Sequence, residues 1–242
     1  MLARTSAIVS ADAPPVETLN ARLAAIAAEF RSVAFASSLG AEDMVVTDAI
    51  LSAGLPISIF TLDTGRLHRE TLSQLDQIRE RYAYAVEVFR PDPAEVDRYV
   101  AGHGLNAFYE SVELRKRCCH IRKVEPLARA LAARDAWITG QRRQQSVTRA
   151  GLALQEHDGV HRIPKFNPLA DWSEAQVWAY ISERSVPYNA LHDRGFPSIG
   201  CEPCTRAIRP GEDVRDGRWW WENRYTKECG LHFRITEKEA PV

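Results

Sequence analysis

Residues 32–53 read SVAFASSLGAEDMVVTDAILSA, and this stretch decides the fold. Its apolar segment at 33–36 predicts a short buried strand, and residues 44–53 carry apolar side chains at helical spacing. Between them, residues 37–43 form a turn of small and polar residues. The order of strand, loop and helix predicts an α/β unit whose loop lies at the carboxyl end of the strand.

The same unit recurs along the chain. A helix is predicted at 17–30, before the deciding stretch. After it come predicted strands at 56–62, 86–89 and 134–139 and predicted helices at 67–81, 119–133 and 173–184. A hairpin is expected within 153–163, around Asp158-Gly159. Alternating strands and helices predict an α/β fold with a parallel sheet flanked by helices, whose ligands gather at the carboxyl ends of the strands.

Beyond residue 187 the sequence loses regular periodicity. We therefore expect an α/β nucleotide-binding region at 1–186 and an irregular C-terminal segment at 187–242, together forming one domain. The C-terminal segment carries three of the five cysteines and the run Trp219-Trp220-Trp221. We find no internal repeat.

Bulk composition excludes several classes of protein. The chain has 242 residues, 45% of them hydrophobic, which is enough for one α/β domain with a large core. A formal net charge of −1 argues against binding to nucleic acid or to an anionic membrane, so any anion site must be local. Residues 1–15 lack the pattern of a secretory signal, and no apolar run reaches the length of a membrane span. We expect a cytoplasmic protein.

The cysteines divide into four plus one. Cys118 and Cys119 are adjacent, Cys201 and Cys204 form a Cys-x-x-Cys pair, and Cys229 stands alone. In a reducing compartment, paired cysteines favour metal binding or redox chemistry over disulfides, which remain an alternative. Four thiolates can hold an iron–sulfur cluster or a zinc ion. Adjacent cysteines strain a small tetrahedral zinc site, so a cluster is favoured, with zinc or a catalytic dithiol as the alternatives.

Lys123 follows Cys119 by four residues on the helix expected at 119–133, which would put the two side chains one turn apart on the same face. Its ammonium group would then link a negatively charged metal centre to an anionic substrate. The alternative is a solvated helix lysine.

Two loops are candidates for anion binding. Ser37-Ser38-Leu39-Gly40 offers backbone N–H groups and hydroxyls at a helix N-terminus, without the lysine of a P-loop. The stretch 140–149, GQRRQQSVTR, begins at Gly140 just past a predicted strand and contains Arg142, Arg143 and Arg149, which suit phosphate or sulfate oxygens. A solvated surface helix is the other interpretation of this stretch.

Six motifs follow one another in a specific order: SSLGAED at 37–43, LDTG at 62–65, KRCC at 116–119, the stretch 140–149, CEPC at 201–204 and KECGLH at 227–232. Together they resemble the assimilatory adenylyl-sulfate (APS) reductases, within the family of APS and phosphoadenylyl-sulfate (PAPS) reductases. The resemblance covers about residues 30 to 235 and implies an adenine nucleotide alpha hydrolase-like fold, in agreement with the strand and helix pattern.

The resemblance also implies a mechanism. The thiolate of Cys229 would attack the sulfur of APS and expel AMP, which leaves an S-sulfonate on the cysteine. Reduced thioredoxin would then release sulfite and close a disulfide on itself. A [4Fe–4S] cluster on Cys118, Cys119, Cys201 and Cys204 would organise the site without carrying electrons. An exposed spare thiol is the plainer interpretation of Cys229.

The remaining site residues are likewise implied by the resemblance. Adenosine would lie against Ser37, Ser38, Gly40, Leu62, Asp63 and Gly65. The phosphosulfate would meet the stretch from Gly140 to Arg149 and the side chains of Lys123, Arg142, Arg143, Arg215, Arg218 and His232.

Rival functions remain open. A PAPS reductase would share the Cys229 segment but typically lacks the other four cysteines, and a dual APS/PAPS reductase is left open. A non-enzymatic iron–sulfur sensor that binds a nucleotide is a remoter alternative, and a homo-oligomer is left open.

Overall fold

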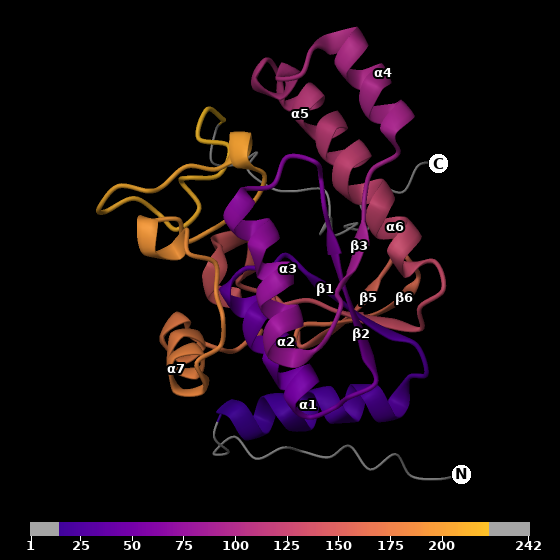
Figure 1. The fold of residues 1–242 in the computed structure, drawn as a ribbon, viewed down its shortest axis with the longest axis vertical. Coiled ribbons are helices and arrows are strands. Elements are labelled where there is room, and N and C mark those ends of the chain that lie inside the picture. Colours follow the sequence, from indigo (N-terminus) through magenta and orange to yellow (C-terminus); the bar gives the residue numbers. More distant parts are fainter. Residues whose placement is uncertain (1–14, 223–242) are drawn as a thin grey trace.

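The computed structural model describes residues 15–222, which fold around a six-stranded sheet (Figure 1). The strands lie in the order β3-β2-β1-β4-β6-β5. Every neighbouring pair is parallel except β5 with β6. The strands are β1 Val33–Ser37, β2 Ile57–Leu62, β3 Glu87–Phe89, β4 Ala136–Ile138, β5 Gln155–Asp158 and β6 Ile163–Phe166. The prediction of a largely parallel sheet flanked by helices is confirmed.

Helices cover both faces of this sheet. They are α1 Pro15–Glu29, α2 Ala41–Ser52, α3 Arg69–Tyr82, α4 Pro93–His103, α5 Val112–Cys119, α6 Glu125–Leu131 and α7 Glu174–Arg184. Side chains of α1, α2 and α7 share one core cluster with β1 and β2, whereas α6 packs against the opposite face (Figure 1). Neither α4 nor the part of α5 before Cys119 was predicted from the sequence.

Burial on two faces explains why the deciding strand lacks polar residues. Val33 and Phe35 of β1 point into the cluster with α1 and α2. Ala34 points the other way, into the cluster with α6, together with Phe60 and Trp137. A strand covered on both faces has a nearly continuous apolar sequence rather than an alternating one.

Helix α2 begins at Ala41, three residues before the predicted start. Gly40 is its extended N-cap residue, and Glu42 and Asp43 lie in the first turn. Acidic side chains in that position stabilise the positive end of the helix, which periodicity of apolar residues does not reveal.

The predicted helix at 119–133 was wrong in detail. The chain passes from α5 into a π-helical segment, His120–Val124, and then into α6. Pro126 has no backbone N–H group, so it cannot continue an α-helical hydrogen-bond ladder from the preceding turn. The irregular turn begins directly after the adjacent cysteines, and π-helical turns frequently occur at functional sites.

The strand order changes direction between β1 and β4, because the chain runs outward from β1 to β3 and returns to the other side of β1. Such a switch point opens a crevice at the carboxyl ends of the strands. The segment after α7 lies at this edge with the short helices His192–Arg194 and Glu202–Cys204, and the predicted irregularity is confirmed for its described part, residues 187–222. None of the helices within residues 15–222 is both long and apolar enough to cross a membrane.

Candidate active site

A cavity of about 560 Å³ lies at the carboxyl ends of β1, β2 and β4. It is walled by the loops that leave these strands, by the first turn of α2 and by the C-terminal segment. Ten residues proposed from the sequence line it: Ser37, Ser38, Gly40, Leu62, Lys123, Gly140, Arg142, Arg149, Arg215 and Arg218. Residues from three of the six motifs therefore meet in one cavity with Lys123, Arg215 and Arg218.

Three residues proposed from the sequence do not line this cavity: Asp63, Gly65 and Arg143. The Asp63 carboxylate accepts a hydrogen bond from the Gly65 backbone and pairs with Arg90 at 3.0 Å. Arg143 donates from Nε to the Leu152 carbonyl oxygen at 2.8 Å. These contacts brace the loops behind the cavity. Cys229 and His232 belong to residues 223–242, which lie outside the described part of the chain.

The loop after β1 is closed by Asp43. Its carboxylate accepts hydrogen bonds from the Ser38 backbone at 2.5 Å and from the Ser38 hydroxyl at 2.6 Å. Burial raises the pKa of Asp43 to about 6, against the lowering effect of the Ser38 hydrogen bonds. This carboxylate fixes the turn that lines the cavity. The sequence analysis quoted Asp43 within a motif but gave it no role.

Asp43 is expected to make stability fall with rising pH. Its pKa is 3.8 in the reference state and about 6 in the fold, so between these values the native state holds the proton more tightly. The free energy of unfolding of Asp43→Asn, relative to the original protein, should increase by up to about 3 kcal/mol from pH 4 to neutral pH. Urea unfolding across this range measures the difference, and a constant difference would contradict the assignment.

Glu42 forms an ion pair with Arg142. The guanidinium donates from Nη2 and Nε to one Glu42 oxygen at 2.6 and 2.9 Å, and Arg142 is almost fully buried. This ion pair ties the loop after β4 to the first turn of α2. Arg142 therefore meets the cavity as part of a paired unit rather than as an isolated cation. The sequence signal for Glu42 was its place in the first turn of a helix.

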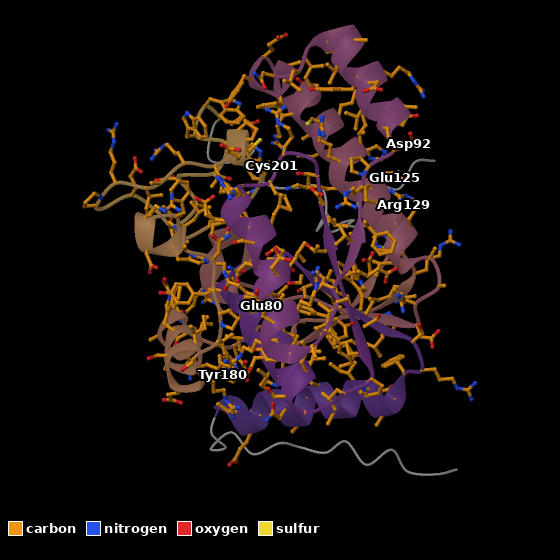
Figure 2. All side chains as sticks on the ribbon, in the orientation of Figure 1. Glu80, Asp92, Glu125, Arg129, Tyr180 and Cys201 are labelled. Carbon is orange, nitrogen blue, oxygen red and sulfur yellow. The ribbon has the colours of Figure 1, made fainter. Side chains whose placement is uncertain are left out.

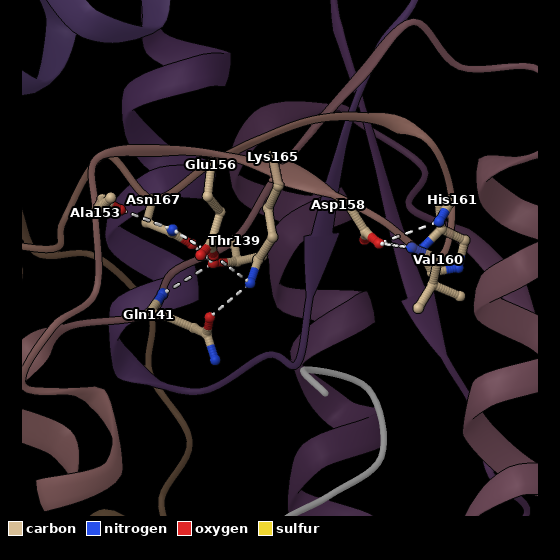
Figure 3. A network of polar contacts seen from close by, with 9 residues as sticks. All are labelled: Thr139, Gln141, Ala153, Glu156, Asp158, Val160, His161, Lys165 and Asn167. Carbon is tan, nitrogen blue, oxygen red and sulfur yellow. Dashed lines mark hydrogen bonds and ion pairs between the residues drawn. The ribbon is translucent and has the colours of Figure 1, made fainter. Parts of the chain in front are cut away.

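A polar network holds the loop after β4 from behind (Figure 3). Buried Lys165 donates to Glu156 at 2.8 Å and to the side-chain oxygen of Gln141 at 3.1 Å. Thr139 donates to Asn167 at 2.6 Å, and Asn167 in turn donates to Glu156. Burial lowers the pKa of Lys165, whereas Glu156 raises it. The network fixes Thr139 and Gln141, both of which line the cavity.

A second, smaller cavity brings together four cysteines from distant parts of the chain. Cys118 and Cys119 reach it from the end of α5, and Cys201 and Cys204 from the C-terminal segment. None of the four forms a disulfide. Cys201 lies beside the loop that leads into α3, where Leu67 pairs with it in an isolated bridge (Figure 2).

The cysteines lie among basic side chains, but their burial disfavours the thiolate form. Four basic side chains line the same cavity: Arg66, Arg115, Arg122 and Lys123. Burial, and then the neighbouring Cys201, raise the pKa of Cys204 to about 12, and burial also raises the pKa of Cys118. A bound cation would favour deprotonation of Cys118 and Cys204. Within residues 15–222, no three Cys, His or acidic side chains are grouped closely enough to ligate a single metal ion.

The two cavities share walls. Lys123 and Trp219 line both of them. Thr64 lines the large cavity and is hydrogen-bonded to the Cys201 sulfur at 3.3 Å. A negatively charged group at the cysteines and an anion in the large cavity would therefore both interact with the Lys123 ammonium.

Comparison with known proteins identifies relatives over most of the chain. Residues 32–207 match the model of the phosphoadenosine phosphosulfate reductase domain. The chain is 66% identical to an adenosine 5′-phosphosulfate reductase of Burkholderia cepacia, covering 95% of this chain and 92% of the relative. It is 57% identical to the enzyme of that name from Neisseria meningitidis serogroup B, covering 91% and 90% of the two chains.

Solved structures support the fold. The phosphate complex of a PAPS reductase from Candida auris superposes with a TM-score of 0.66 at 28% identity, covering 81% of this chain and 91% of that one. A Candida glabrata FMN adenylyltransferase superposes with a TM-score of 0.57 at 14% identity, covering 95% and 83%. The second likeness concerns the fold alone.

Proposed function

Because this chain belongs to the phosphoadenosine phosphosulfate reductase family, we propose that it reduces APS to sulfite and AMP in sulfate assimilation. The support is twofold. The relatives at 66% and 57% identity carry the name adenosine 5′-phosphosulfate reductase. The large cavity also has the composition that a nucleotide anion requires, with apolar residues and several basic side chains in its wall.

The reacting group of this proposal is Cys229. Its thiolate attacks the sulfur of APS, a new S–S bond forms, and the bond between sulfur and the phosphate oxygen breaks. AMP leaves with that electron pair. A thiolate of reduced thioredoxin then attacks Cys229 and releases sulfite, and the second thioredoxin thiol frees Cys229 as the thioredoxin disulfide closes. Both electrons thus come from the two thioredoxin thiols, in keeping with a cytoplasmic enzyme.

The smaller cavity, called here the cysteine cavity, carries the donor set that an iron–sulfur cluster uses. Cys118, Cys119, Cys201 and Cys204 would be its ligands, and a [4Fe–4S] cluster spans more space than a single ion, so it accepts sulfurs spread around a cavity. Arg66, Arg122 and Lys123 in the same wall would offset the negative charge of a cluster held by four thiolates, whereas Arg115 is already paired with Glu222. The cluster supplies fixed charge and local order beside the substrate.

Lys123 and the arginines hold the phosphosulfate in this proposal. Lys123 is placed between the two cavities, and Arg149, Arg215 and Arg218 line the large one. These cations stabilise the charge that develops on the departing phosphate of AMP, so the step needs no strong general acid. The loops at 37–40 and 62–65 bind the adenosine.

The large cavity is called the nucleotide cavity from here on. The wall that it shares with the cysteine cavity is the observation that carries the proposal. It gives the four cysteines other than Cys229 a reason to lie beside the substrate. The test is an anaerobic assay of sulfite release with thioredoxin, using APS and PAPS side by side. We expect saturable release of sulfite from APS. Saturation with PAPS and none with APS would assign the chain to the phosphorylated substrate instead.

A further inference from the structure

Trp219 is held by two arginines that belong to different cavities. The guanidinium carbon of Arg115 lies 4.8 Å from the centre of the indole ring, and that of Arg218 lies 4.7 Å from it. Arg115 lines the cysteine cavity, Arg218 lines the nucleotide cavity, and Trp219 lines both. Each contact has the geometry of a cation–π interaction.

Glu222 anchors the first of these arginines. Its two oxygens accept hydrogen bonds from Nε and Nη2 of Arg115 at 2.9 and 2.8 Å. The two side chains are 1% and 4% exposed, so the ion pair is fully withdrawn from water. Burying such a pair costs desolvation free energy that apolar side chains would not cost, whereas its bidentate geometry fixes direction. The pair therefore fixes Trp219 against α5 in one orientation.

Arg218 depends on that orientation because its other contacts are weak. Its Nη1 reaches the Ser198 hydroxyl at 3.4 Å and the Ile199 carbonyl oxygen at 3.2 Å. Its Nε is buried without a hydrogen-bond partner among the described residues. A Cβ atom on Gly200 would lie 2.2 Å from Nη2, so the guanidinium is wedged between the indole ring and this backbone.

We infer that Glu222 and Arg115 are positioning residues for substrate binding. They act through Trp219, which holds the Arg218 guanidinium toward the phosphosulfate of a substrate bound in the nucleotide cavity. The inference rests on the proposed function, since it takes APS as the ligand. Neither Glu222 nor Arg115 lines the nucleotide cavity, so their effect on the substrate passes through Trp219 and Arg218.

The experiment is a double-mutant cycle on APS affinity. Calorimetry on anaerobically purified Cys229→Ser protein measures binding without turnover, with Glu222→Gln and Arg218→Gln added singly and together. Each single change should weaken APS binding about tenfold, the effect of losing one well-placed charged hydrogen bond. The double variant should bind APS no more weakly than the Arg218→Gln variant does, and the iron content of all variants should equal that of the parent protein. Arg115→Lys keeps the charge but loses the bidentate hydrogen bonds to Glu222, so it should also weaken APS binding.

Glu212→Gln is the matched control. Glu212 makes a bidentate but more exposed pair with Arg206, at 2.7 Å in the same segment, and neither residue lines either cavity. This variant should bind APS normally.

The outcomes separate the inference from the proposed function. Fully additive effects of Glu222→Gln and Arg218→Gln would overturn the inference, as would Glu222→Gln protein that loses iron or thermal stability while its APS affinity is unchanged. Absence of any APS binding would overturn both proposals. Non-additive effects on APS affinity, together with no sulfite release by the protein that retains Cys229, would uphold the inference and overturn only the reductase function.

Discussion

Replacing Cys229 by serine is expected to abolish sulfite release from APS while the cluster and APS binding remain. A serine hydroxyl is a far weaker nucleophile at neutral pH than a thiolate, and it cannot form the S-sulfonate that thioredoxin resolves. Loss of the nucleophile in such enzymes removes several orders of magnitude of rate, about 10⁴-fold or more. Mass spectrometry after a single turnover should show the sulfonate on the original protein and none on the variant.

Cys204→Ser is the control for this experiment. Cys204 lies in the cysteine cavity, so this variant should lose iron and the visible colour of the cluster. The two variants therefore distinguish the proposed nucleophile, Cys229, from a proposed cluster ligand, Cys204. A Cys229→Ser protein that still releases sulfite at the original rate would exclude the S-sulfonate mechanism and favour the sensor interpretation.

The central part of the fold could be predicted from the sequence because its signals are local. Residues 33–36 and 56–62 are apolar runs of strand length, and the loop between 37 and 43 contains only small and polar residues and one leucine. The helix over Pro93–His103 was harder to recognise, since it exposes most of its length and has one buried residue, Tyr99. The π-helical turn at His120–Val124 depends on packing around the cysteines, which no periodicity encodes.

The residue types of the site could be predicted from the sequence, but the interaction partners of these residues could not. Arg142 and Arg143 are adjacent and chemically alike, and both were proposed as anion ligands. In the fold, Arg142 is paired with Glu42, and Arg143 turns away to the Leu152 carbonyl group. Glu42 lies 100 residues from Arg142 along the chain, so spacing in the sequence carries no record of this pair. The ion pair of Glu222 with Arg115 was missed for the same reason.

The two acidic residues that open α2 give the site its internal order. Glu42 restrains the loop after β4 through Arg142, and Asp43 restrains the loop after β1 through Ser38. Both loops border the nucleotide cavity. One helical turn thus sets the relative position of two loops that line this cavity, and any change that shifts this turn should affect both of them.

Gly140→Ala is the change expected to disturb this arrangement most. A Cβ atom at position 140 would lie 2.0 Å from an Asp43 carboxylate oxygen and 3.3 Å from the Asp43 backbone nitrogen. The carboxylate cannot rotate away without losing its hydrogen bonds to Ser38, so the loop after β4 or the start of α2 must move. We expect kcat/KM for APS to fall about a hundredfold, because small displacements of binding groups have such effects. The Tm should also fall by several degrees.

Gly102→Ala tests whether that loss is specific. Gly102 lies in the α4 helix, with open space around its Cβ direction, so alanine should leave activity unchanged and stabilise the helix by up to about 1 kcal/mol. Steady-state kinetics and thermal unfolding of both variants provide the comparison. If Gly140→Ala retained the original kcat/KM, the Asp43 contact with Ser38 could not be what fixes the substrate loops. The first turn of α2 would then stabilise the fold without ordering the site.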